Sequence, residues 1–228
     1  MSPQDPLWPL RERRLSAPFV VAQLGQSLDG RIATVTGESQ WINGECALDH
    51  VHRLRAHVDA VIVGVGTVIA DDPRLNVRRV PGRNPARVVL DPRGRLPAGS
   101  QCMADDGARR FIVRAEPGPC PPGAHEIVIT SADGIVSPKA ILSRLSEHGL
   151  GRILVEGGAR TVSTFVAEGC VDRLHVLVAP MLIGSGRPGL ELPPVASLGE
   201  ALRPPTRVHV FEDGDVLFDC ALKPGEGA

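Results

Sequence analysis

Short apolar runs alternate with helical patterns along most of this 228-residue chain, and this alternation constrains the fold more than any other feature. Residues 19–24 and 59–65 are dominated by valine, alanine and other apolar side chains, which is typical of buried strands. Between them, one helix face is marked by four apolar residues, Ala47, Val51, Leu54 and Val58. The segment therefore predicts a β–α–β unit.

The rest of the chain continues the same pattern. Five short segments rich in β-branched residues predict further strands at 87–90, 111–114, 126–130, 152–155 and 174–178. Helices are expected over 138–148, which starts with Ser137-Pro138, and over 160–168, which ends at Gly169.

The C-terminal part predicts a hairpin. Segments 207–211 and 216–220 have strand composition and flank Asp213-Gly214, a favoured hairpin turn. We therefore expect an α/β fold with a mixed, mostly parallel sheet flanked by helices and a C-terminal antiparallel hairpin.

Length and composition favour one domain. A chain of 228 residues with 43% hydrophobic residues suits a single α/β domain, which we place at residues 17–224. Residues 1–16 mix three prolines with arginines and lack the apolar core of a secretory signal, so we expect a flexible N-terminal arm or a strap across a dimer.

Charge and cysteine usage narrow the class of partner. A net charge of −1 argues against nucleic acid, and no apolar run approaches the roughly 20 residues needed to span a membrane. The five scattered cysteines form no CxxC pair, which indicates reduced thiols. We therefore expect a cytoplasmic protein that binds a small molecule.

Two glycine-rich segments indicate a nucleotide site. In LVEGGARTV a glycine pair separates a predicted strand from a predicted helix, so the backbone and the helix amides could approach a pyrophosphate. Taken alone, EGG before a helix is more often a tight turn. The second segment, IGSGRPG at residues 183–189, could line the same cleft or form a mobile surface loop.

The run from Ser27 to Arg78 carries the most specific signal. It contains SLDGRIA, GESQWI, HRLRA and GVGTVIADDPRLNVR in that order. Their order and spacing resemble the reductase domain of the bacterial bifunctional riboflavin-biosynthesis deaminase/reductase, a family with a dihydrofolate-reductase-like fold. The resemblance covers about residues 19–222. It implies NADPH as cofactor and, as phosphorylated small-molecule substrate, a pyrimidine with an N-linked ribose 5-phosphate that is reduced to the ribityl form.

The resemblance also implies roles for individual residues. Residues carried over as cofactor contacts are Gly25, Trp41, Thr67, Asp71, Gly158, Ala159, Arg160, Thr161, Val162, Ser163 and Thr164. Those carried over as substrate contacts are Ser39, Arg55, Leu75 and Arg78, and Glu156 is expected to face the substrate. Taken singly, Trp41 is more typical of a core residue and Asp71 of a turn or helix cap, and Arg55 and Arg78 could be surface charges.

One position departs from the family pattern. Gln23 stands where the family usually has a lysine, and an amide donates only a neutral hydrogen bond. Gln23 and Glu156 are the two candidate catalytic residues. The leading hypothesis is a reductase of the ribosylamino-pyrimidine phosphate. A reductase of another heterocycle such as a pterin, and a non-catalytic NADPH-binding module, are the alternatives.

Three further expectations concern the deaminase, the cofactor and assembly. The chain contains no H-x-E and no P-C-x-x-C, so we expect the reductase without the zinc deaminase and no metal ligands among the seven histidines. Arg160 and Arg187 are candidates for the 2′-phosphate of NADPH, or ordinary surface charges. The resemblance alone implies a homodimer, through a sheet edge or the C-terminal hairpin.

Overall fold

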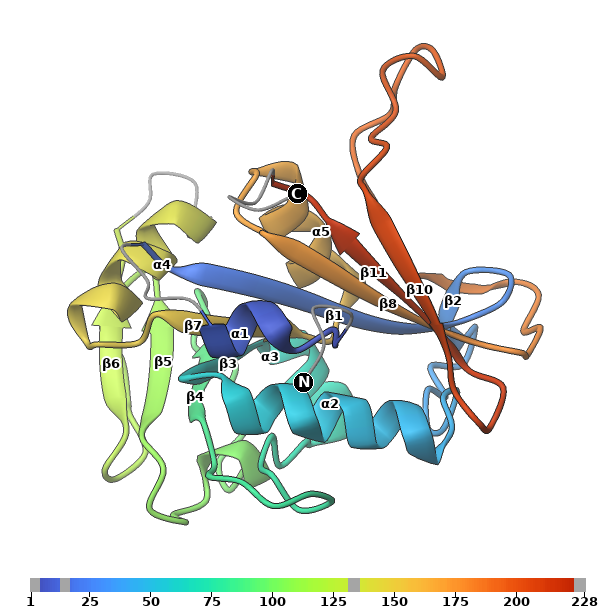
Figure 1. Ribbon diagram of the computed structural model, residues 1–228. Helices are drawn as coiled ribbons and strands as arrows, with labels where there is room; N and C mark the ends of the chain where they lie inside the picture. Colours follow the sequence, from blue (N-terminus) through green and yellow to red (C-terminus); the bar gives the residue numbers. More distant parts are fainter. Residues whose placement is uncertain (1–4, 13–16, 131–135, 224–228) are drawn as a thin grey trace.

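A nine-stranded sheet forms the centre of the computed structural model, which describes residues 5–12, 17–130 and 136–223 (Figure 1). The strand order is β10-β11-β8-β1-β7-β3-β4-β5-β6. In chain order these strands are β1 (Phe19–Ser27), β3 (Ala60–Gly64), β4 (Ala86–Leu90), β5 (Arg110–Arg114), β6 (His125–Val128), β7 (Arg152–Glu156), β8 (Arg173–Ala179), β10 (Thr206–Val210) and β11 (Val216–Ala221).

The mixed sheet predicted from the sequence is confirmed. All neighbours from β8 to β6 run parallel, and β11 and β10 add an antiparallel pair at the edge next to β8. The strands of the predicted β–α–β unit, β1 and β3, are not adjacent, because β7 lies between them. This insertion brings the carboxyl ends of β1, β7 and β3 together.

Helices cover both faces of the sheet. They are α1 (Trp8–Glu12), α2 (Glu45–His57), α3 (Val65–Asp71), the 3-10 turn η1 (Gln101–Met103), α4 (Pro138–Glu147) and α5 (Ala159–Ala167). The first three pack on one face and α4 and α5 on the other (Figure 1). Successive strand residues alternate between the two cores: Val20 and Ala22 pack with α4 and α5, and Val21 packs with α2. No helix in the described ranges is long and apolar enough to cross a membrane.

Of the N-terminal segment, expected to be a flexible arm or a strap across a dimer, the structure describes residues 5–12. This part contains the short helix α1. Leu7, just before the helix, and Leu10, within it, are each 3% exposed and join the core beneath the sheet. Burying such side chains stabilises a fold by about 1.5–3 kcal/mol each, so this part is anchored. Residues 1–4 and 13–16 lie outside the described residues.

The start of α2 is fixed by the C-terminal hairpin. Gly44, which precedes the helix, donates its N–H to Oδ2 of Asp215 at 2.8 Å, and Cys46 N–H donates to Oδ2 of Asp213 at 2.8 Å. Both aspartates lie in the turn between β10 and β11. Carboxylates satisfy the free amides of a helix start and complement its positive dipole end. The hairpin therefore sets the position of a helix that supplies residues to the site.

Candidate active site

A cavity of about 1230 Å³ opens beyond the carboxyl ends of β1, β3 and β7. Ligands of open α/β sheets bind at this edge, where successive loops diverge. Pockets for one small ligand measure roughly 300–1000 Å³, so this cavity has room for more than one. A two-stranded sheet of β2 (Arg31–Thr34) and β9 (Gly186–Pro188) flanks it and contributes Ile32, Ala33, Arg187 and Pro188 to its wall.

Two strand-to-helix loops pack closely on one side of the cavity. Gly158 has φ 63°, and a Cβ there would lie 2.7 Å from Oγ1 of Thr67 in α3. A Cβ at Gly64 would lie 2.5 Å from Oγ1 of Thr161 in α5. Only glycine fits such contacts without displacing the neighbouring loop. No side chain caps α5 at Gly158, so its first amides are free to bind an anion such as a pyrophosphate.

Most of the expected cofactor residues line this part of the cavity. They are Gly25, Trp41, Thr67, Asp71, Gly158, Ala159, Arg160, Thr161 and Thr164. Val162 and Ser163 do not, because the helix turns them away. Val162 is fully buried in the core, and Ser163 Oγ accepts the N–H of Glu191 at 2.8 Å. The expectation that these two residues contact the cofactor is therefore not supported by their positions.

The opposite side of the cavity contains a buried ion pair. Nε of Arg55 donates to Oε1 of Glu156 at 2.7 Å, and Nη2 donates to Oε2 at 2.6 Å. The two residues are 8% and 6% exposed. Nη1 of Arg55 donates to the carbonyl of Asn76 at 3.1 Å. Both carboxylate oxygens thus accept from one guanidinium. The sequence interpretation expected Glu156 to face the substrate, whereas in the structure its carboxylate faces Arg55.

Uncompensated positive charge lies next to this pair. Arg78 is exposed, lines the cavity and donates from Nη1 to Oδ1 of Asn76 at 3.0 Å. Burial and the nearby charges of Arg55 and Arg74 lower the pKa of Arg78. Ser39 and Leu75 also line the cavity, and Ser39 Oγ donates to Oδ1 of Asp71 at 3.2 Å. This pocket is suited to an anion, because several arginines line it and, within the described residues, Arg78 has no carboxylate partner.

Gln23 lies on the cavity floor between the two sides. In the sheet register it stands opposite Glu156 of β7 and His175 of β8, and its side chain is 8% exposed. Within the described residues the side-chain amide makes no hydrogen bond, so its donor and acceptor remain available to a ligand. An amide at this position holds a polar group without adding a charge beside the ion pair.

Several cavity residues were missed by the sequence interpretation. Asn43 packs its Oδ1 where a Cβ of Gly25 would be, at 2.1 Å, which explains the glycine. Arg74, Arg93 and Arg95 also line the cavity. Arg74 lies inside the DDPRLNVR run and could have been noticed there, whereas Asn43 and the two arginines after β4 carry no local signal. In the described part of the chain, no group of three or more His, Cys, Asp or Glu side chains could hold a metal ion.

The comparisons with known proteins agree with this geometry. Residues 18–204 match the RibD C-terminal domain family. The 2,5-diamino-6-ribosylamino-4(3H)-pyrimidinone 5′-phosphate reductase of Methanothermobacter thermautotrophicus is 39% identical over 175 residues, which are 73% of this chain and 80% of that protein. The riboflavin biosynthesis protein RibD of Aquifex aeolicus is 36% identical over 172 residues, 74% of this chain but 48% of that protein. This chain therefore spans about half the length of the RibD protein.

Solved structures give the same result. A deaminase/5-amino-6-(5-phosphoribosylamino)uracil reductase of Thermotoga maritima superposes with a TM-score of 0.77 and 29% identity, over 90% of this chain and 56% of that one. Dihydrofolate reductase of Enterococcus faecalis shares the fold alone, with a TM-score of 0.50 and 12% identity over 89% of this chain and 96% of that one. The fold is that of a class of reductases, which implies a nicotinamide cofactor. The chain belongs to the RibD C-terminal domain family.

The buried ion pair gives a stability prediction. Replacing Glu156 by Gln leaves the Arg55 guanidinium buried without its counter-charge, which costs about 3–5 kcal/mol. Urea denaturation should show a loss of that size in the free energy of unfolding. Glu147→Gln is the control, since its pair with Arg144 is half exposed and should contribute less than about 1 kcal/mol. Equal small losses in both variants would mean that the buried pair does not stabilise the site.

Proposed function

We propose that this chain is an NADPH-dependent reductase that converts the ribosyl group of a phosphoribosylamino-pyrimidine to the ribityl form in riboflavin biosynthesis. One observation carries the proposal: a single cavity joins an uncapped, glycine-lined helix start to a cationic pocket, with Gln23 between them. Two relatives are named as reductases of pyrimidines that carry a ribosyl phosphate, which supports the choice of substrate class.

The cofactor side of the cavity fits NADPH. The start of α5 suits the diphosphate, because no side chain caps it at Gly158 and the positive end of the helix dipole favours an anion. Trp41 is 63% exposed and lines the cavity, so its ring is free to pack on a planar group. Bound NADPH would supply the hydride that reduces the sugar carbon C1′.

The cationic pocket fits the substrate phosphate. Arg78 is the main phosphate ligand in this proposal, with Arg74 beside it and Ser39 at the boundary with the cofactor. Arg55 has a different role, because its charge is matched by Glu156 and its Nη1 holds the Asn76 carbonyl. It fixes the wall of the pocket and keeps two N–H groups for a ligand.

Gln23 orients the substrate but does not protonate it. Its amide can both donate to and accept from a pyrimidine edge, whereas it cannot release a proton at neutral pH. Glu156 is fully engaged by Arg55. The proton that balances hydride addition therefore comes from water, as the sugar ring oxygen becomes the hydroxyl of the ribityl chain.

The test is NADPH oxidation with 5-amino-6-(5-phosphoribosylamino)uracil or its diamino analogue. We expect turnover, and a kcat/KM at least about tenfold lower for the dephosphorylated compound, because a charged hydrogen bond contributes roughly 1.5–3 kcal/mol. Arg78→Gln should reduce kcat/KM for the phosphorylated substrate alone. Equal use of both compounds would refute the phosphate pocket, and NADPH binding without turnover on either compound would favour a binding role or another heterocycle.

We also infer the residues that select NADPH over NADH. Arg93 and Arg95 follow β4, line the cavity and are exposed, and within the described ranges their guanidinium groups have no hydrogen-bond or ion-pair partner. Arg160 lies in the first turn of α5 on the same cavity. Unpaired arginines near the expected diphosphate are suited to the 2′-phosphate that distinguishes the two cofactors.

Removing these charges should therefore relax cofactor choice. In the double variant Arg93→Gln/Arg95→Gln we expect KM for NADPH to rise by about 10- to 100-fold, with KM for NADH unchanged. Arg144→Gln, a surface arginine paired with Glu147 on α4, serves as the matched control. If both cofactors weaken equally, the arginines do not read the 2′-phosphate.

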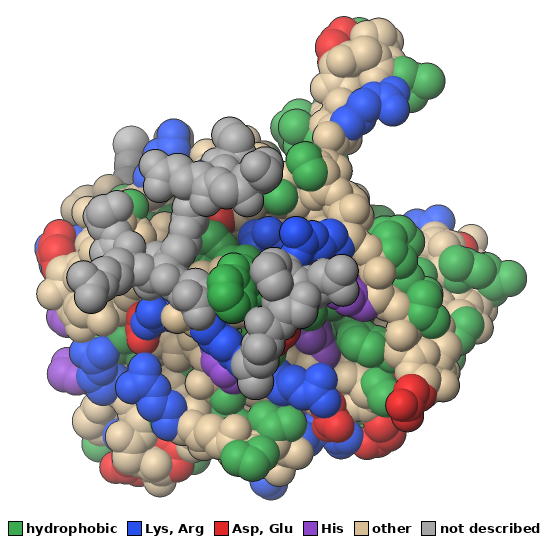
Figure 2. All heavy atoms as spheres, in the orientation of Figure 1, with side chains coloured by type: hydrophobic (Ala, Val, Ile, Leu, Met, Phe, Trp, Pro, Cys, Tyr) green, Lys and Arg blue, Asp and Glu red, His purple; other side chains and the backbone are tan. Residues whose placement is uncertain are grey.

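A homodimer is the assembly that we propose. The segment between β9 and β10 projects from the body and carries hydrophobic side chains (Figures 1 and 2), including Leu198 at 79% and Leu202 at 70% exposure. The adjacent edge strand β10 exposes Val208 and Val210. Exposed apolar surface beside an open strand edge favours a second copy of the chain.

Charge on the projecting segment should disrupt that dimer. Size-exclusion chromatography with light scattering should give twice the chain mass for the wild type and one chain mass for Leu198→Glu/Leu202→Glu. Lys139→Glu, an exposed change on α4 at the far side of the sheet, should remain dimeric. A monomeric wild type would contradict the proposal.

The cysteines support a cytoplasmic location for this reductase. All five are unpaired in the structure, and Cys102 and Cys170 are buried. Unpaired thiols are typical of a reducing compartment. Disulfides in the freshly isolated protein, detected by alkylation and mass spectrometry, would argue against this location.

A further inference from the structure

The wall of the cationic pocket is a loop without regular hydrogen bonding. After α3 the chain runs from Asp72 to Arg78 with no helix or strand, and Leu75 adopts φ 55°, a left-handed conformation that is unfavourable for its side chain. Leu75 is 2% exposed and packs into the core. The shape of this loop must therefore be held by contacts from outside it.

Three successive residues of the loop are held through their backbone. The Asn76 carbonyl accepts from Nη1 of Arg55 at 3.1 Å. The N–H of Val77 donates to Oδ1 of Asn84 at 2.8 Å, and the N–H of Arg78 donates to Nδ1 of His52 at 3.1 Å. Of the three residues that supply these contacts, Arg55 belongs to the pocket described above. His52 and Asn84 have no assigned role.

His52 is built to accept this hydrogen bond. It lies on α2 and is 2% exposed. Burial first, and then the charges of Arg55 and Arg78, lower the pKa of His52 to about 4. The imidazole therefore stays neutral at physiological pH and keeps Nδ1 as an acceptor for the Arg78 amide.

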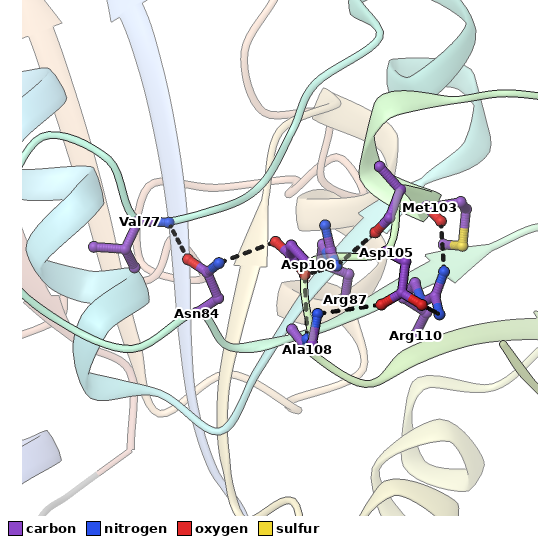
Figure 3. A network of polar contacts seen from close by, with 10 residues as sticks. Val77, Asn84, Arg87, Met103, Asp105, Asp106, Ala108 and Arg110 are labelled. Carbon is purple, nitrogen blue, oxygen red and sulfur yellow. Dashed lines mark hydrogen bonds and ion pairs between the residues drawn. The ribbon is translucent and has the colours of Figure 1, made fainter. Parts of the chain in front are cut away.

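Asn84 is held in one orientation by a network behind it (Figure 3). Its Nδ2 donates to Oδ2 of Asp106 at 2.9 Å, which leaves Oδ1 directed at Val77. Asp106 in turn pairs with Arg87, a side chain that is 2% exposed, and accepts the N–H of Ala108 at 3.1 Å.

A second buried arginine, Arg110, holds the turn that contains Asp105 and Asp106. Arg110 stands opposite Arg87 in the register of β4 and β5. It donates from Nη1 to the Met103 carbonyl at 2.9 Å and lies 3.3 Å from Asp105 (Figure 3). Two neighbouring strands thus anchor the Asp105–Asp106 turn, and that turn fixes the amide of Asn84.

We propose that His52 and Asn84 are positioning residues for the substrate phosphate: they hold the backbone of Val77 and Arg78 so that the Arg78 guanidinium faces the cavity. This rests on the proposed function, in which Arg78 binds the phosphate. The two contacts come from different elements, α2 and the segment before β4, so the loop is held from both sides. The Arg78 guanidinium also donates a hydrogen bond to Oδ1 of Asn76 in the same loop.

The test compares phosphorylated and dephosphorylated substrate in His52→Leu and Asn84→Ala. Each variant should raise KM for the phosphorylated compound by about tenfold, the effect of losing about 1.4 kcal/mol of binding. KM for the dephosphorylated compound, kcat and the Kd of NADPH should stay within about twofold. His52→Asn should restore KM, because the amide oxygen can take the place of Nδ1.

Val88→Ala is the control for loss of stability. Val88 neighbours Arg87 on β4 but is fully buried in the opposite core, away from the loop. It should lower the thermal midpoint without changing the ratio of the two KM values. If His52→Leu does not fold, the half-buried Asn84 carries the test alone.

The outcomes separate this inference from the proposed function. A wild type that does not prefer the phosphorylated substrate would refute the phosphate pocket and this inference together. A wild type with that preference, retained unchanged in His52→Leu and Asn84→Ala, would overturn the positioning role alone. The positioning role would also be overturned if KM for the phosphorylated compound is as high in His52→Asn as in His52→Leu, because restoring an acceptor for the Arg78 amide would then have no effect.

Discussion

The buried ion pair between Arg55 and Glu156 is the interaction on which the site depends. It joins α2 to the end of β7 through two residues that are 101 positions apart in sequence, on the cationic side of the cavity. Moving α2 away from β7 would leave a buried charge without its partner, which is energetically costly, so the pair fixes the two elements relative to each other. Because Nη1 of Arg55 also holds the Asn76 carbonyl, the same guanidinium fixes the wall that carries Arg78. The glycine-lined side and the cationic side of the cavity are thereby set relative to each other.

The elements around this pair are arranged to keep α2 in place. Its start is held by Asp213 and Asp215 of the C-terminal hairpin, and Leu54 near its end packs in the core against the sheet. Strand β7, which carries Glu156, lies between β1 and β3. The loops that follow β3 and β7 then interlock through Gly64 and Gly158. The hairpin at one edge of the sheet thus contributes to a site in its middle.

The sequence predicted the main strands and helices because their periodicities are strong and local. It missed α3, since Val65 and Val68 continue the apolar run of β3, and it missed β2 and β9, which are short and pair across a long separation. Most of the residues that the family motifs single out line one cavity. The motifs could not show that Val162 and Ser163 turn away, or that Glu156 is occupied by Arg55, because both depend on packing that forms only in the fold. His52 and Asn84 act through backbone amides, which leave no pattern in the side chains of a sequence.

The most direct test of the account is to follow the hydride itself. The reaction would be run with NADPH that carries deuterium at the transferable position of the nicotinamide, and the product analysed by mass spectrometry and NMR. The account predicts a ribitylamino-pyrimidine phosphate with one deuterium at C1′ of the ribityl chain. A product without deuterium at that carbon, or no product while NADPH binds tightly, would contradict it.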